Sequence, residues 1–203
     1  MAITDGYCSL AMLKAALRIQ DGIDDSLLEL AISSASREID GSAERKFTST
    51  SGTRVYNPTD PFLLVTDDIV SITTLKTSLD GVTFDQQWAT SDFQLEPLNG
   101  LAGGLTTPYT RIRAIGNYLW PTWAVGSTAA NEASVQITGV FGWSSVPVAI
   151  QQACVILAMR IYKRLDSPLG IAGGFGDMGA MRVGRFDPDV EALVAPYRRL
   201  GVG

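Results

Sequence analysis

The chain has 203 residues, of which 46% are hydrophobic and 18% charged, with no histidine and a formal net charge of −5. This composition excludes a disordered chain, and the acidic balance argues against sequence-independent DNA binding, which relies on Lys and Arg to neutralise phosphates. Its apolar runs are too short to cross a membrane, and the first residues lack the basic and apolar regions of a secretory signal, so we expect neither.

Two helices are predicted near the N-terminus. Ser9 is a suitable N-cap for a short helix, because apolar residues follow it at intervals of three and four. After Gly22, Asp24 and Asp25 provide capping side chains and first-turn negative charge for a longer helix that extends to about Lys46. One side of this helix is apolar and the other carries most of the charges, which indicates a core face and a solvated or subunit-facing face.

Residues 48–146 have a different composition, with short runs of Thr, Val, Ile, Phe and Trp separated by Gly, Pro, Asn and Asp. Such runs are typical of β-strands, and Asp80–Gly81 favours a tight turn between two of them. The strands that we predict are 54–56, 63–65, 69–78, 93–96, 110–115 and 133–141. We interpret the whole stretch as a β-rich insertion.

Four tryptophans lie in this insertion: Trp88, Trp120, Trp123 and Trp143. Few basic residues alternate with them, so packing or interface anchoring explains them better than a base-stacking platform. The loop from Trp120 to Trp123 fits contact with a neighbouring subunit and simple packing about equally well.

Helical spacing returns after Pro147, a favourable first-turn residue, and continues to about Tyr162. A glycine-rich stretch over residues 167–186 follows, for which we expect a mobile loop. Asp187 then caps a short last helix that ends near Pro196. The predicted fold class is therefore α+β. We expect a bundle of about four helices, built from residues 1–47 and 147–203, with the β-rich insertion 48–146 between its second and third long helices.

The sequence offers little for catalysis or for binding a metal or cofactor. Histidine is absent, and no phosphate-binding loop, nucleophile elbow or dinucleotide-binding glycine motif occurs. The pairs Asp24–Asp25 and Asp67–Asp68 lack the ligand spacing of a calcium loop, and caps and turns explain them better. We therefore expect no enzyme activity, no cofactor and no metal.

The two cysteines, Cys8 and Cys154, lie in apolar contexts that we predict to be helical, without the spacing of a zinc site. We expect two reduced core cysteines. A disulfide between them would require the two helices to pack at the right distance, which the sequence leaves open.

The layout resembles the head-tail connector family of tailed bacteriophages. The resemblance covers about half of the chain and rests on ten strings: YCSL 7–10, LKAAL 13–17, DDSLL 24–28, AISSASREID 31–40, RKF 45–47, PVAIQQAC 147–154, RIYKR 160–164, SPLG 167–170, FDPDV 186–190 and PYRR 196–199. The long β-rich middle departs from the smallest members of that family, although larger relatives carry such insertions.

The resemblance implies a structural protein of the virion neck that is assembled in the host cytoplasm. Its copies, usually twelve, would form a ring beneath the portal protein, extend the channel through which genomic DNA passes without specific binding, and dock a stopper or tail-completion protein. The main alternative is another neck or tail protein, such as a tail-completion or tail-terminator protein.

Two segments are candidate contacts with the portal or a neighbouring subunit. We expect the glycine-rich loop to become ordered on assembly, with apolar anchors at Phe175, Met178, Met181 and Phe186. The resemblance further suggests that the last helix docks into the portal through Tyr197, Arg198 and Arg199.

Overall fold

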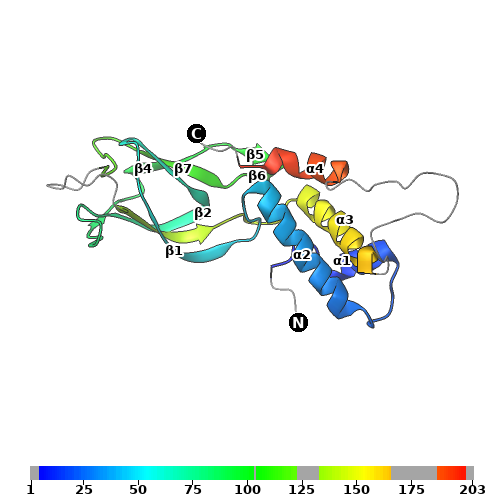
Figure 1. Ribbon diagram of the computed structural model, residues 1–203. Coiled ribbons are helices and arrows are strands. Elements are labelled where there is room, and N and C mark those ends of the chain that lie inside the picture. Colours follow the sequence, from blue (N-terminus) through cyan, green and yellow to red (C-terminus); the bar gives the residue numbers. More distant parts are fainter. Residues whose placement is uncertain (1–4, 103, 123–132, 166–186, 200–203) are drawn as a thin grey trace. The chain divides into compact units, whose positions relative to one another are not determined.

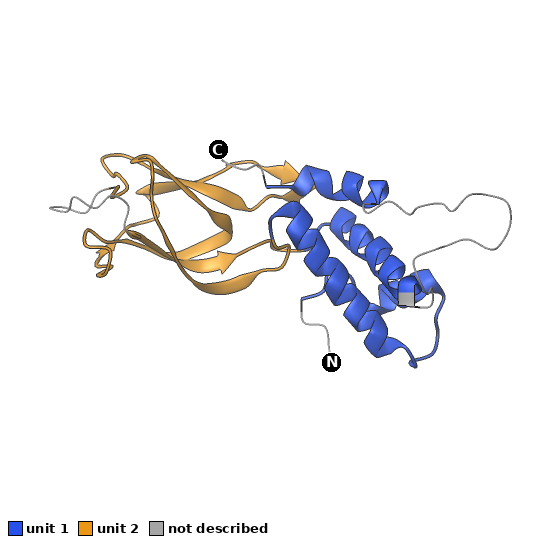
Figure 2. Cartoon of the chain, viewed as in Figure 1, with its two compact units in different colours: residues 1–45, 146–203 blue, residues 46–145 orange. Residues whose placement is uncertain are grey.

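The computed structural model describes residues 5–102, 104–122, 133–165 and 187–199 (Figure 1). These residues contain four α-helices and a mostly antiparallel sheet, so the predicted α+β class is confirmed. The chain divides into two compact units, one built from residues 1–45 and 146–203 and the other from residues 46–145 (Figure 2). We call them the helical unit and the strand unit. The finer description, a helical bundle with domain boundaries near residues 47 and 147, stays a prediction.

The helical unit contains α1 (Leu10–Leu17), α2 (Asp25–Ala43), α3 (Val148–Leu165) and α4 (Pro188–Val194), and α4 continues into the short 3-10 helix η2 (Ala195–Tyr197). α2 packs against α3, α4 packs mainly against α3, and α1 contacts both α2 and α3. The buried side chains of α2 recur at intervals of one, three and four residues: Leu28, Ala31, Ile32, Ala35, Ser36, Ile39 and Ala43. All of them except Ser36 belong to the predicted core face, whereas Leu27 and Leu30, which were also expected there, are exposed. None of the helices in the described part of the chain is long and apolar enough to cross a membrane.

The ends of the first two helices test the capping predictions. Ser9 caps α1 as expected, because its side chain accepts a hydrogen bond from the backbone N–H of Met12. Asp24 occupies the N-cap position of α2, but its side chain makes no capping bond and instead accepts from the Tyr162 hydroxyl at 2.6 Å. The predicted extension of α2 to about Lys46 is wrong, since Glu44 adopts a left-handed conformation (φ 54°) that ends the helix.

The strand unit is built on a six-stranded sheet whose main path runs β1-β8-β2-β7-β4, with β3 paired to β2 (Figure 1). Its strands are β1 (Thr50–Tyr56), β2 (Leu63–Thr77), β3 (Gln86–Gln87), β4 (Phe93–Glu96), β7 (Tyr109–Ala114) and β8 (Val135–Phe141). All pairings are antiparallel. A separate two-stranded hairpin joins β5 (Leu101–Ala102) to β6 (Leu105–Thr106).

The predicted strands are largely confirmed, with one correction. Residues 63–65 and 69–77 belong to the single strand β2, which has a register shift between Val65 and Ile69 in its pairing with β7; Ile69 pairs with both β7 and β8. Such a bulge bends a strand without ending it, and the intervening Thr66, Asp67 and Asp68 resembled a turn in the sequence. The Asp80–Gly81 turn is confirmed, since Asp80 accepts hydrogen bonds from the N–H groups of Val82 and Thr83.

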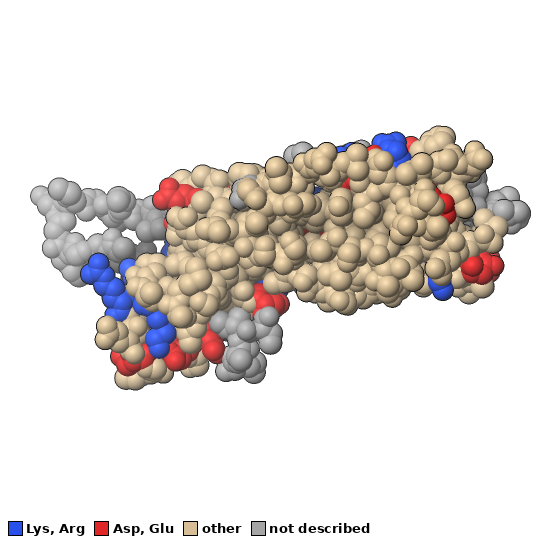
Figure 3. Space-filling model, turned by 180° about the vertical axis from the view of Figure 1, so that it is seen from behind, with Lys and Arg blue, Asp and Glu red and all other residues tan. Residues whose placement is uncertain are grey.

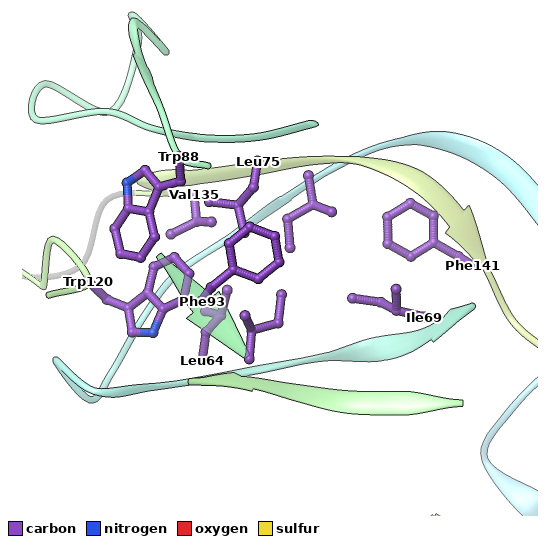
Figure 4. Close-up of a cluster of buried hydrophobic side chains, with 10 residues drawn as sticks. Leu64, Ile69, Leu75, Trp88, Phe93, Trp120, Val135 and Phe141 are labelled. Atoms are coloured by element: carbon purple, nitrogen blue, oxygen red, sulfur yellow. The ribbon is translucent and has the colours of Figure 1, made fainter. Parts of the chain in front are cut away.

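The core of the strand unit is a cluster of ten buried apolar residues that lie between the strands of the sheet (Figure 4). Trp88 and Trp120 stack in it with their ring centroids 4.4 Å apart and their planes nearly parallel. Trp143 is also buried and packs against Phe47. Packing therefore explains these three tryptophans, as predicted, whereas Trp123 lies outside the described residues.

Candidate interaction surfaces

Over β1, β8 and β2, the side of the sheet that faces away from this core is nearly free of charge. The register places three rows of side chains across β1, β8 and β2: Ser51, Val140 and Ser71; Thr53, Thr138 and Thr74; Val55, Gln136 and Lys76. We call these nine residues the outer face. Lys76 is its only charged member, and the Thr53 and Thr138 hydroxyls hydrogen-bond to each other at 2.8 Å. Its short side chains and low charge make the outer face suited to packing against another protein surface.

The outer face borders an edge strand that lacks the usual protection. Among the described residues, β1 pairs only with β8, and β4 at the opposite end of the sheet pairs only with β7. β4 is short, ends at the charged Glu96 and is followed by Pro97, features that discourage further pairing. β1 has seven residues, no proline and one charged side chain, Arg54. The β1 edge is therefore the better candidate for contact with another chain.

One face of the strand unit carries few charged side chains. On the face of the molecule shown in Figure 3, Lys, Arg, Asp and Glu are sparse over the strand unit. The core of a protein interface is depleted in charged residues relative to the rest of the surface. A sparsely charged surface on a chain with 37 charged residues (16 basic and 21 acidic) is thus a feature that favours protein contact.

A second apolar area lies at one end of the strand unit. Phe62, Ile115, Tyr118 and Leu119 are all exposed large hydrophobic residues. They are brought together by backbone hydrogen bonds from Ala114 to Phe62 and from Trp120 to Pro61. Tyr118 also packs on Trp88. Residues 123–132, which follow in the chain, lie outside the described part, so the structure does not identify what covers this area.

Asp67 and Asp68 do not form a cation site or a turn. Asp67 accepts hydrogen bonds from Arg54 at 2.7 Å and from the Tyr56 hydroxyl at 3.2 Å, on the inner side of β1. Asp68 is buried and accepts a hydrogen bond from the indole N–H of Trp143. The prediction of turn or cap residues was wrong because both lie within β2, where they join neighbouring segments of the strand unit. In the described part of the chain, no group of three acidic or cysteine residues could hold a metal ion.

The helical unit contains a small cavity between α2, α3 and α4. Its volume is about 50 Å³, and Glu38, Arg160, Arg164, Asp187 and Glu191 contribute charged groups to its lining. Arg160 and Asp187 approach each other to 3.9 Å. A space of this size holds at most a few water molecules, whereas pockets for small organic ligands are several times larger. The cavity is therefore a poor candidate for a substrate site.

The structure places Tyr197, Arg198 and Arg199 at the end of the helical unit. Tyr197 is buried, and Arg198 forms an ion pair with Glu191 at 2.7 Å and a hydrogen bond to the Ser42 carbonyl. The backbone N–H of Arg199 donates to the carbonyl of Ala43 at the end of α2. The segment is thus fixed to its own unit in the single chain, with Arg198 exposed. The role of the three residues in docking stays a prediction.

The remaining predicted contact residues, Phe175, Met178, Met181 and Phe186, lie outside the described residues, as does the glycine-rich stretch that contains them. The outer face, in contrast, was missed by sequence reasoning. Its only signal was the alternation of Ser, Thr and Val in strands with few charges. That pattern does not reveal which strands are neighbours, and only the register brings the nine residues together.

No family model matches this sequence, and no curated protein matches it. Among solved structures, a chain in the neck of an empty GTA (gene transfer agent) particle, computed with C6 symmetry, has a TM-score of 0.58 and 21% identity. A chain in the neck of a native GTA particle, computed with C12 symmetry, has a TM-score of 0.56 and 20% identity. In both cases the match covers 100% of this chain and 96% of the other. The chain therefore shares its fold with chains found in the neck of these particles.

Proposed function

We propose that this protein is a structural head-tail connector (adaptor) subunit of a tailed bacteriophage or phage-like particle, and not an enzyme. Its copies would form a ring beneath the portal, extend the DNA channel and dock a stopper or tail protein. The observation that carries the proposal is the fold match, which spans the helical and strand units together and covers 96% of two chains from particle necks. The two neck structures were computed with C6 and C12 symmetry, which also supports a ring of identical subunits.

The outer face and the open edge of β1 provide a surface for such assembly. A ring of identical subunits needs head-to-tail contacts, in which each copy presents one surface to the next and a different surface to the previous one. A nearly uncharged sheet face can pack against a neighbour without desolvating ion pairs. The net charge of −5 suits a channel that lets DNA slide through without binding it.

The proposal is tested by co-sedimenting the purified full-length protein with the portal ring of the same particle and imaging the complex by electron microscopy. A second ring stacked beneath the portal is the expected result. The protein alone, and the portal alone, serve as controls for self-assembly and for portal stacking.

The same experiment separates the leading alternative, a tail-completion or tail-terminator protein. Such a protein would leave the portal unoccupied and would instead form rings or caps on tail tubes. Binding to tails without binding to the portal would therefore overturn the adaptor role and support the alternative.

A further inference from the structure

Two cysteines from opposite ends of the chain meet inside the helical unit. Cys8 lies immediately before the N-cap of α1, so the prediction that it lies in a helix is wrong. Cys154 lies in the second turn of α3, as predicted. Both are free thiols, and their side chains are 6% and 0% exposed. The two thiols lie close enough to interact electrostatically, and the Cys154 sulfur approaches the carbonyl oxygen of Ile32 at 4.0 Å.

Ser36 of α2 holds the two cysteines in this arrangement. Its hydroxyl oxygen accepts a hydrogen bond from the backbone N–H of Tyr7 at 3.0 Å and lies 3.5 Å from the sulfur of Cys154. The hydroxyl donates to the carbonyl of Ile32 one turn earlier, at 2.8 Å, so the serine itself is satisfied within α2. The segment before α1, the middle of α2 and the start of α3 thus converge at the cysteine pair.

We propose that Cys8 and Cys154 form a reversible intramolecular disulfide when the protein meets a small-molecule disulfide as oxidant. Two short contacts through Ser36 connect Tyr7, the neighbour of Cys8 in the chain, to the sulfur of Cys154, so the two thiols lie close together and bond formation requires side-chain rotation and small backbone adjustments. This modification goes beyond the proposed adaptor function and does not depend on it.

The reaction proceeds by two thiol–disulfide exchanges. In the first, one cysteine thiolate attacks the oxidant RSSR, forms a mixed disulfide with one R–S group and releases RSH. In the second, the other cysteine thiolate attacks the protein sulfur of that mixed disulfide and releases the second RSH. Two electrons pass from the cysteine pair to the oxidant, and the two thiol protons end on the two RSH molecules.

The environment of the pair favours thiolate formation at one of its members. The neighbouring Cys8 thiol lowers the pKa of Cys154, although burial acts in the opposite direction. The same contact and burial raise the pKa of Cys8. Since the thiolate is the attacking species and both thiols are buried, reaction with the oxidant requires local opening of the segment before α1.

The disulfide would connect the two chain segments that build the helical unit. Cys8 belongs to the segment before the strand unit and Cys154 to the segment after it, so the closed loop contains all of residues 46–145. Cross-linking residues so far apart in sequence strongly restricts the unfolded chain, and the stabilisation grows with loop length in the chain-entropy model. The oxidised protein should therefore unfold at a higher denaturant concentration than the reduced protein.

The test uses the full-length chain equilibrated in buffers of reduced and oxidised glutathione at several ratios, starting from both the reduced and the oxidised protein. Samples are blocked with N-ethylmaleimide after unfolding and weighed by intact mass spectrometry. The expected result is a species about 2 Da lighter than the reduced chain that carries no maleimide. Its urea midpoint should be higher than that of the reduced protein and should return to the reduced value after treatment with a phosphine.

Cys8→Ser and Cys154→Ser are the matched controls. Each should show at most one glutathione adduct, no 2 Da loss, and the same urea midpoint in oxidising and reducing buffer. The proposal is overturned if both cysteines of the natural chain still take up maleimide after equilibration from both directions in the most oxidising buffer. It is equally overturned if the only disulfide-linked species are dimers.

Discussion

The indole N–H of Trp143 donates a hydrogen bond to a carboxylate oxygen of Asp68 at 3.2 Å, and both side chains are buried in the strand unit. The backbone reinforces this contact, because the N–H of Gly142 donates to the carbonyl of Asp68 at 2.7 Å. A buried carboxylate is costly unless it is hydrogen-bonded. The pair therefore fixes the segment that follows β8 against the bulged region of β2.

Replacing Trp143 with Phe should destabilise the strand unit by roughly 1–3 kcal/mol, because it removes a donor from a buried carboxylate while keeping an aromatic ring. Urea unfolding followed by circular dichroism measures the change. Asp68→Asn is the control, since its amide oxygen can still accept from the indole, and we expect a smaller loss. An unchanged midpoint for Trp143→Phe would show that the hydrogen bond contributes nothing measurable.

Two glycines that face each other across β1 and β8 should respond in opposite ways to the same substitution. A Cβ at Gly139 would lie 2.2 Å from the carbonyl oxygen of Ser71, whereas a Cβ at its register partner Gly52 would meet nothing within 4 Å. Gly139→Ala should thus force β8 away from β2 and cost about 1–3 kcal/mol or more.

Gly52→Ala should be neutral or slightly stabilising, because it removes only the conformational freedom of the unfolded chain. Both variants are compared with the natural chain by thermal unfolding. Equal effects at the two positions would contradict the close approach of β8 and β2 at Gly139.

Tyr56 makes the stability of the strand unit sensitive to alkaline pH. Burial and the neighbouring carboxylate of Asp67 raise the pKa of Tyr56 from 10.0 to about 12. A raised pKa in the folded state means that the contribution of the protonated phenol is complete below pH 10 and is lost as pH rises through 12.

The stability of the natural chain should therefore fall between pH 10 and pH 12 more steeply than that of Tyr56→Phe, which cannot ionise at this position. Urea midpoints across this range provide the measurement, and ultraviolet absorbance follows the ionisation of the phenol. Parallel pH profiles for the two proteins would show that Tyr56 ionises as easily in the folded state as in the unfolded state.

Sequence periodicity predicted the helices well because each helix buries a stripe that is set by its own local spacing. The apolar positions of α2 and the Ser9 cap are examples, and both depend on residues within a few positions of one another. The strands were also located from local composition. The error at β2 arose because Thr66, Asp67 and Asp68 form a bulge in which polar side chains pair with Arg54, Tyr56 and Trp143, partners that are distant in sequence.

The candidate surfaces were less predictable, for the same reason. The outer face depends on the register of three strands from residues 50–56, 63–77 and 135–141, which no local pattern determines. The contact between Cys8 and Cys154 likewise depends on how α1, α2 and α3 pack, and the sequence left it open. Local signals therefore described the elements, whereas the sites that join distant segments required the structure.

Arg198 tests the predicted docking of the C-terminal segment without removing it. Deleting residues 187–203 would also remove Val190, Val194 and Tyr197, which are buried in the helical unit, so a point variant is preferable. Arg198→Glu should abolish or strongly weaken portal attachment in co-sedimentation. Its effect on stability should stay within about 1 kcal/mol, because the Arg198–Glu191 pair is exposed.

The matched control is Arg113→Glu in the strand unit, where Arg113 forms a comparable exposed ion pair with Glu96 at 2.6 Å. This variant should attach to the portal as the natural chain does. Attachment of Arg198→Glu at the natural level would place the docking surface elsewhere.

The outer face is tested by introducing a charge where subunits are expected to meet. Val55 lies on the outer face and is 47% exposed, so Val55→Glu should leave the monomer fold intact. Burying an unpaired carboxylate in an interface costs several kcal/mol, and ring formation should therefore fall by at least tenfold in affinity. Val82→Glu is the control, because Val82 is 80% exposed in the turn region after Asp80, away from the three rows of the outer face.

Analytical ultracentrifugation and electron microscopy with and without the portal ring measure assembly. Rings of Val55→Glu that form as readily as those of Val82→Glu would exclude the outer face as the contact between neighbouring subunits.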